Sequence, residues 1–248
     1  MLGRRLVAGS VLAGGMALAG LAAMPALAAA SSHTTPPDAA TLYREALATT
    51  RSWSVHYVST STQSQISLLE TGDAGPASGT QTVATGKGNL NDTITIDVIG
   101  GLTYVKGNVG GLEVLAGLNA ADAVGAAGHW IEFSTTNSAF SQVVAGVRSH
   151  DVADELQLKG PLTLGHARTL DGTAVEAIDG TQSYSGHKST RIVLYVRAHG
   201  NHVPVEEDAL DAKGKVSGAL HITYSHWGET VRPEAPPGAL PFGPVSAV

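Results

Sequence analysis

The sequence predicts a mainly β protein with helices (α+β), built on one long antiparallel sheet that curls and carries helices on its concave face. Three observations predict this fold. Short stretches of alternating polar and apolar residues recur along the chain. Turn signals rich in Gly, Asp and Asn separate these stretches. One Ala-rich stretch interrupts the series near its middle, and no linker divides the chain after its N-terminal segment.

The N-terminus has the pattern of an export signal. Arg4 and Arg5 precede an apolar run, and the small residues of Ala26-Leu27-Ala28 form a cleavage site. We therefore expect residues 1–28 to be a cleavable signal peptide. The alternative is a retained membrane anchor, but the run is short and Gly- and Ala-rich. Residues 29–37 are expected to be a flexible linker.

The composition excludes several classes of function. The formal net charge is −6, and removal of the signal peptide makes it −8 because two arginines and no acidic residue are lost. This charge argues against nucleic acid and anionic lipid surfaces as partners. The absence of cysteine excludes disulfides, thiolate zinc sites and an acyl anchor after the cleavage site. With 5% aromatic residues, the core must be mainly aliphatic, which suits an aliphatic ligand.

The first half of the mature chain predicts one helix and then strands. Asp38 is a suitable N-cap for a helix over residues 38–50. Gly72–Gly79 is expected to be a loop, and Gly107–Gly111 a hairpin turn that precedes no helix. The expected strands are Trp53–Val58 with its hairpin partner Ser64–Leu69, Thr93–Val98 and Leu102–Lys106.

The second half begins with helices and returns to strands. Leu118–Ala127 is Ala-rich and is expected to be helical, and Ser138–Leu156 has helix-like spacings broken near Gly146 or His150. The Pro-rich tail, 233–248, is expected to lie along the surface as neither sheet nor helix. The expected strands are His129–Phe133, Leu162–Leu170, Thr173–Ile178, Arg191–Arg197, Val203–Asp208 and Val216–Tyr224, with a turn at Asp179-Gly180 among those that separate them.

About ten strands joined by tight turns tend to curl, which leaves a concave apolar face. The N-terminal helix and residues 118–156 are the available covers, and a loose fit would leave a hydrophobic pocket between cover and sheet. Two strands present apolar stripes with period two. The candidate lipid-binding residues are Ile94, Ile96, Val98, Ile192, Leu194 and Val196.

No catalytic constellation or metal-ligand motif is evident, so we expect no catalytic residues, no metal, no cofactor and no enzyme activity. His199 and His202 fit a solvated turn, and His221 and His226 point to opposite sides of a strand. Glu206-Glu207-Asp208 is interpreted as solvated charge at a sheet edge. No Gly-x-Ser-x-Gly elbow is present. Core positions are expected for the three tryptophans, with a pocket as the alternative: Trp53, Trp130 and Trp227.

The order of these features resembles the LolA-like superfamily and, within it, the LppX/LprG-type lipoproteins, although the lipidation cysteine is missing. The resemblance covers roughly residues 40–237. The segments that carry it are Thr93–Ile99, Gly101–Gly107, Gly128–Phe133, Leu170–Val175, Ile178–Gly180, Ile192–Arg197, Val203–Val205 and Tyr224–Val231, with Ala235-Pro236 near the end.

This resemblance implies a strongly curved antiparallel half-barrel with helices in its concavity, formed here by a single domain over residues 38–232. It also implies an exported protein of the cell envelope that binds the acyl chain of a lipid or lipoprotein, as a carrier or sensor. Without the lipidation cysteine, we expect it to be soluble after signal-peptide cleavage or held by an envelope protein partner. The alternatives are a non-enzymatic interaction domain whose cavity is collapsed and, third, a secreted hydrolase.

Overall fold

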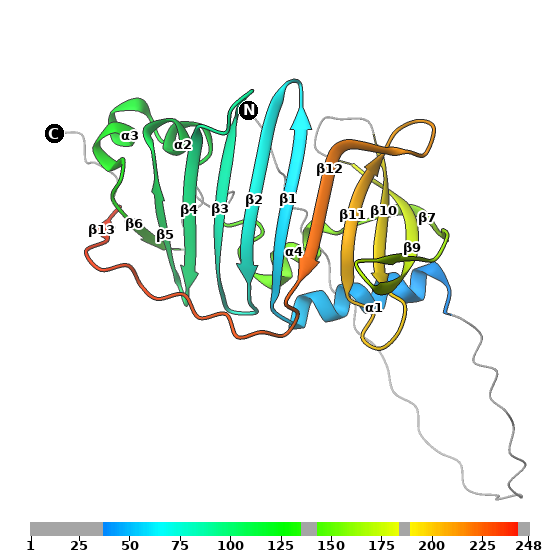
Figure 1. Ribbon diagram of the computed structural model, residues 1–248. Helices are drawn as coiled ribbons and strands as arrows, with labels where there is room; N and C mark the ends of the chain where they lie inside the picture. The colour runs from blue at the N-terminus through cyan, green and yellow to red at the C-terminus, as the bar shows by residue number, and fades with distance from the viewer. Residues whose placement is uncertain (1–36, 135–142, 184–188, 243–248) are drawn as a thin grey trace, which may run out of the picture.

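The computed structural model describes residues 37–134, 143–183 and 189–242. Its strands form one large, open and curved antiparallel sheet (Figure 1), so the predicted fold class is confirmed. In the described part of the chain, no helix has the length and apolar character needed to cross a membrane. The predicted signal peptide, 1–28, and the predicted linker up to residue 36 lie outside the described residues.

The sheet has 13 described strands in the order β13-β6-β5-β4-β3-β2-β1-β12-β11-β10-β9-β7, with β8 paired to β9 beside this path. All pairs are antiparallel except β13 with β6. The strands are β1 (Val55–Gln63), β2 (Ile66–Ala74), β3 (Ser78–Lys87), β4 (Asp92–Ile99), β5 (Leu102–Gly107), β6 (Ile131–Ser134), β7 (Lys159–Leu164), β8 (Arg168–Leu170), β9 (Thr173–Gln182), β10 (Thr190–Arg197), β11 (Pro204–Leu210), β12 (Val216–Ser225) and β13 (Leu240–Pro241).

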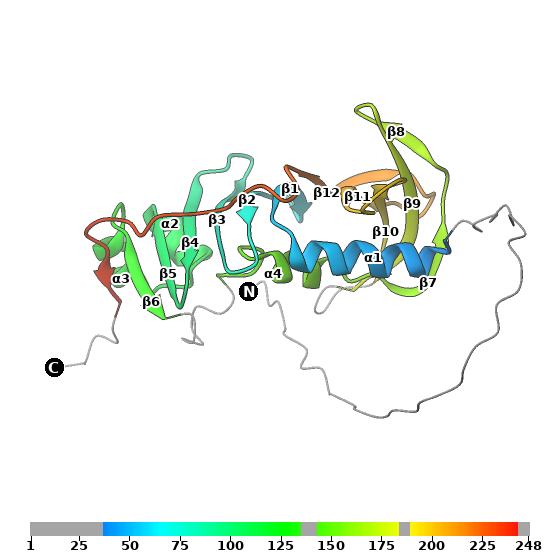
Figure 2. The ribbon, with the colours of Figure 1, turned by 90° about the horizontal axis from the view of Figure 1, so that it is seen from below.

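Four described helices accompany the sheet: α1 (Ala39–Ser52), α2 (Val109–Val114), α3 (Ala120–Ala126) and α4 (Ser149–Glu155). Asp38 caps α1 as predicted, because its side chain accepts a hydrogen bond of 2.7 Å from the Thr41 amide. Figure 2 shows α1 beneath the half of the sheet that contains β9–β12, with α4 beside it and nearer to β1 and β2. The predicted helix over 118–127 is confirmed as α3. Residues 138–142 of the next predicted helical stretch lie outside the described residues, and α4 is its last part.

Two predicted turns are wrong because their glycines serve close packing inside strands. Gly72 lies within β2, where the ring of Tyr57 crosses it, and a Cβ at this position would lie 2.6 Å from the ring. Gly180 lies within β9, where a Cβ would lie 2.9 Å from the Leu162 side chain. The predicted 72–79 loop therefore shrinks to the short connection between β2 and β3.

The expected hairpin turn at 107–111 is also wrong, because helix α2 begins at Val109. Asn108 caps this helix by accepting a hydrogen bond of 2.7 Å from the Gly111 amide. The same side chain accepts from the Thr93 amide and donates to Asn91, so it fastens the start of α2 to β4. Gly111 is required because a Cβ would lie 2.1 Å from the Thr93 carbonyl oxygen.

The Pro-rich tail is not entirely irregular, because β13 pairs in parallel with β6 at the margin of the sheet. The Leu240 and Phe242 amides donate to the carbonyls of Trp130 and Glu132 at 2.8 and 2.7 Å. Pro241 stands between these two donors, where the strand needs no amide, so proline is compatible with the pairing. Residues 243–248 of the predicted tail lie outside the described residues.

Candidate ligand-binding face of the sheet

The six candidate lipid-binding residues all lie on one face of the sheet, as the strand registers establish. One row of directly paired residues runs across five strands: Ile96, Gln81, Gly72, Tyr57 and Tyr224. Ile222, two residues before Tyr224, pairs with Glu207, and Glu207 pairs with Leu194. Because paired residues share a face, Ile96 and Leu194 point to the same side. This side also holds the buried residues of the helices, and we call it the covered face.

The covered face carries two separate apolar clusters. Ile94, Ile96 and Val98 belong to the first cluster, together with Leu112 of α2 and the buried alanines of α3. The other three candidates belong to the second cluster, together with residues of α1 and α4: Ile192, Leu194 and Val196. All six are 0–2% exposed. The structure thus buries every candidate residue but divides the set between two clusters.

A band of buried polar side chains on β1–β3 lies between these clusters. It consists of Ser59, Glu70, Gln81 and Thr85, and it is bordered by Tyr57 of the second cluster. The Tyr57 hydroxyl donates a hydrogen bond of 3.0 Å to the Gly146 carbonyl, which ties the 143–147 segment to the middle of the sheet. The covered face is therefore apolar at both sides and polar at its centre.

Tyr43 joins the two helices that cover the second cluster. Its hydroxyl donates to the Leu156 carbonyl at 2.9 Å and accepts from the Leu158 amide at 2.7 Å, immediately after α4. Burial raises the pKa of the Tyr43 hydroxyl, so it stays protonated as this bridge requires. An exposed ion pair of 2.9 Å between Arg51 and Asp154 adds a second link, although such surface pairs contribute little.

Glu207 contradicts the interpretation of residues 206–208 as solvated edge charge. Its strand, β11, is an interior strand between β10 and β12, and the Glu207 side chain is 1% exposed. Oε2 accepts a hydrogen bond of 3.3 Å from the Tyr224 hydroxyl, whereas Oε1 has no hydrogen-bond partner in the described structure. Burial raises the pKa of Glu207 to about 8, and the charges of Glu155 and Asp208 act in the same direction.

Glu206 and Asp208 lie on the opposite face, where His221 joins them. One ligand atom of each residue lies within 4.8 Å of the others, a spacing that could hold a metal ion. Both carboxylates already have side-chain partners from the chain itself. His221 Nδ1 lies 2.8 Å from Asp208, and Arg168 lies 2.5 Å from Glu206. This cluster was not predicted from the sequence, although the i, i+2 spacing of two acids on a strand indicates a shared face.

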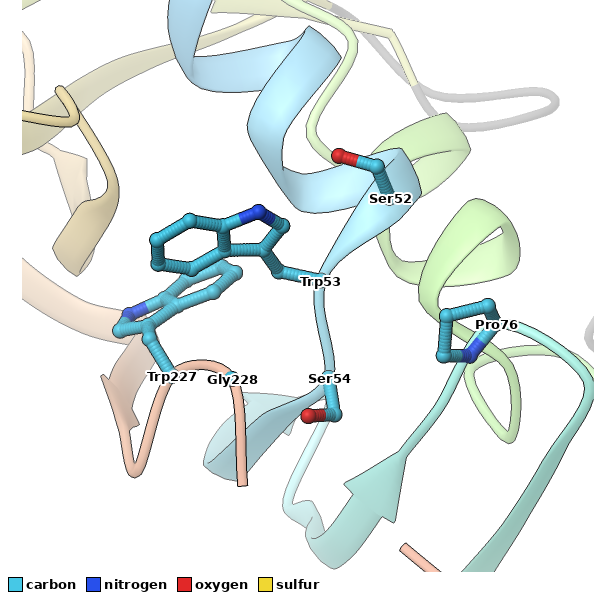
Figure 3. Close-up of a pocket in the computed structure, with 6 residues that line it drawn as sticks. All are labelled: Ser52, Trp53, Ser54, Pro76, Trp227 and Gly228. Atoms are coloured by element: carbon cyan, nitrogen blue, oxygen red, sulfur yellow. The ribbon is translucent and has the colours of Figure 1, made fainter. Parts of the chain in front are cut away.

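Two surface hollows lie at one end of β1 and β12. The first, of about 530 Å³, is flanked by Trp53 and Trp227 (Figure 3). The second, of about 330 Å³, is lined in part by His56 and His226. Trp53 is 36% exposed, so the expectation of a core position is wrong for this residue. Neither hollow is lined by the six candidate residues.

Comparisons with known proteins give similarities among solved structures only. No protein-family model matches the sequence, and no curated protein matches it. LprF from Mycobacterium bovis is similar, with a TM-score of 0.49 and 16% identity over 81% of this chain and 97% of LprF. The lipoprotein LppX from Mycobacterium tuberculosis gives 0.45 and 16% over 78% and 97%. A LolA superfamily protein from Nitrosomonas europaea gives 0.30 and 11% over 79% and 96%.

Proposed function

We propose that this protein is an exported, non-enzymatic binding protein of the cell envelope, a carrier or sensor that takes up the acyl chain of a lipid or lipoprotein. The acyl chain lies between the covered face of the sheet and the helices. One observation carries the proposal: the two apolar clusters of the covered face are covered by separate helices whose buried residues are mostly small. The buried helical residues are Ala39, Leu42, Ala46, Thr50, Gly111, Leu112, Ala123, Ala126, Ser149, Val152 and Ala153.

Small residues on the covering helices make it easier for a ligand to replace these helices on the sheet. Little apolar area is lost when such a helix moves away, because Ala and Gly contribute few methylene groups. The ladder of the sheet stays intact, since the helices meet it mainly through side chains. Each acyl methylene that replaces the cover contributes about 0.8 kcal/mol, so a chain of about ten carbons gives useful affinity without polar contacts.

The test is saturable and competable binding of a fluorescent fatty-acyl probe to the purified protein. Binding should depend little on ionic strength, because an apolar contact is not screened by salt. Ile96→Asp and Leu194→Asp should each weaken binding by at least about tenfold, because each places a charge in an apolar lining. The controls, Ile66→Asp and Leu164→Asp, alter residues that are 46% and 44% exposed and should bind as the wild type does.

If an aspartate variant fails to fold, the corresponding alanine variant replaces it, and binding is measured on the folded fraction. Non-saturable partition of the probe, or binding that disappears in salt, would contradict the carrier proposal.

A second candidate function is an envelope interaction domain whose cavity its own side chains fill. The burial of all six candidate residues favours it, as does the exposed hollow beside Trp53 and Trp227. Native mass spectrometry after gentle purification separates the two functions. A bound lipid supports the carrier, whereas a bare chain that also excludes the acyl probe supports the interaction domain.

A further inference from the structure

Glu207 is out of place in a purely hydrocarbon-binding surface. It stands in the second apolar cluster between its registered neighbours Leu194 and Ile222. An aliphatic side chain here would continue the apolar stripe on both sides. A buried carboxyl group is instead costly, since polar groups removed from water require hydrogen bonds.

Only half of this carboxyl group is satisfied. The Tyr224 hydroxyl donates a hydrogen bond to Oε2, and Oε1 is buried without a hydrogen-bond partner in the described structure. Tyr43 of α1 and Glu155 of α4 face Glu207 from the two covering helices, and Asp208 follows it on the strand. None of these groups is a cation, so this carboxyl is not one partner of a buried ion pair.

We propose that Glu207 is the polar anchor of the acyl-binding face, and that its carboxyl donates a hydrogen bond from Oε1 to the carbonyl oxygen of a neutral acyl ester. This inference rests on the proposed function and narrows its ligand. The ligand is an esterified acyl chain, with the ester at Glu207 and the chain against Ile192, Leu194 and Val196. A free fatty-acid anion is disfavoured because Glu155 and Asp208 add negative charge near this position.

The protonation state agrees with the role of a donor. Burial raises the pKa of Glu207 to about 8, so at neutral pH most molecules carry the proton that the hydrogen bond needs. As pH rises through about 8 the proton is lost, and two oxygens that can only accept remain. The preference for an ester should therefore disappear in mildly alkaline solution, while attraction for a plain hydrocarbon chain persists.

The test compares methyl decanoate, undecane and decanoate as competitors of a bound fluorescent acyl probe. In the wild type at neutral pH, methyl decanoate should compete about 5- to 10-fold better than undecane, as one buried hydrogen bond would give. Decanoate should compete less well than the ester. Glu207→Leu should remove the difference between ester and hydrocarbon yet still bind undecane. Glu207→Gln should keep the preference, because its amide also donates, and lose the dependence on pH.

Glu206→Gln is the matched control, because it changes the neighbouring acid on the opposite face and should alter neither the preference nor its pH dependence. Equal competition by ester and hydrocarbon in the wild type would overturn the role of Glu207 and leave the proposed function intact. Failure of every apolar competitor to displace the probe would overturn the proposed function itself. If Glu207→Leu does not fold, the pH dependence of the wild type against Glu207→Gln decides the question.

Discussion

At the scale of the residue, the ionisation of Glu207 is linked to folding. Its pKa is about 8 in the folded protein, against 4.5 for an ordinary glutamate. Between these values the folded chain holds a proton that the unfolded chain has released. The contribution of Glu207 to stability is therefore greatest below pH 4.5 and falls as pH rises to about 8.

We predict that Glu207→Gln removes this loss of stability with rising pH. The difference in unfolding free energy between wild type and variant should change by at most about 1.4 kcal/mol per pH unit within this interval and stay constant above it. Urea denaturation at a series of pH values measures this difference. Parallel pH profiles for the two proteins would show that Glu207 ionises as freely in the folded chain as in the unfolded one.

At Gly72 the fold requires a residue that has no side chain. The Tyr57 ring occupies the space where a Cβ would stand, and the Tyr57 hydroxyl is held by Gly146. We predict that Gly72→Ala destabilises the fold by about 1–3 kcal/mol through overpacking. Gly125→Ala, in helix α3 with open space around it, should be neutral or stabilising by about 0.5–1 kcal/mol. Thermal and chemical denaturation of both variants provides the comparison.

The burial of single residues was predictable where alternation was strict. Ile94, Ile96 and Val98 follow one period-two pattern, and the structure buries all three. The burial of Glu207 was not predicted, because three consecutive acidic residues are typical of a solvent-exposed segment unless the strand is known to be interior. That knowledge depends on the order of strands in the sheet, which local patterns do not contain.

At the scale of the element, α1 and α4 behave as one cover because Tyr43 satisfies a carbonyl and an amide beside the end of α4. We predict that Tyr43→Phe costs about 1–3 kcal/mol, since it leaves two backbone groups without their partner. Hydrogen exchange should accelerate in α1 and α4 while the β3–β4 ladder is unchanged. Tyr195→Phe, on the opposite face under Arg168, is the control and should leave exchange in α4 unaltered.

Most elements were predictable from periodicity and caps, and the failures have a common cause. Strand β3 and the ends of β2 and β9 contain glycines that usually signal turns, and β13 contains a proline that usually excludes sheet. In each case a neighbouring strand or side chain makes the residue favourable. Such contacts are remote in sequence, so local propensity gives the wrong answer.

At the scale of the whole molecule, the place where the protein acts is predicted from the export signal alone. Ala26-Leu27-Ala28 predicts a mature N-terminus at or within about two residues of Ala29. N-terminal sequencing or intact-mass analysis of the exported protein measures this directly. An exported chain that still begins at Met1 would contradict the prediction and favour a retained anchor.

The two outermost described strands of the sheet, β7 and β13, each contain a proline, Pro161 and Pro241. An open sheet ends in unpaired backbone groups that can recruit the sheet of another molecule. Proline has no amide to offer an incoming strand, and a shift of register in β7 between Lys159 and Thr163 further interrupts its ladder. The sheet can therefore remain open while both of its margins offer an incoming strand an interrupted row of backbone donors.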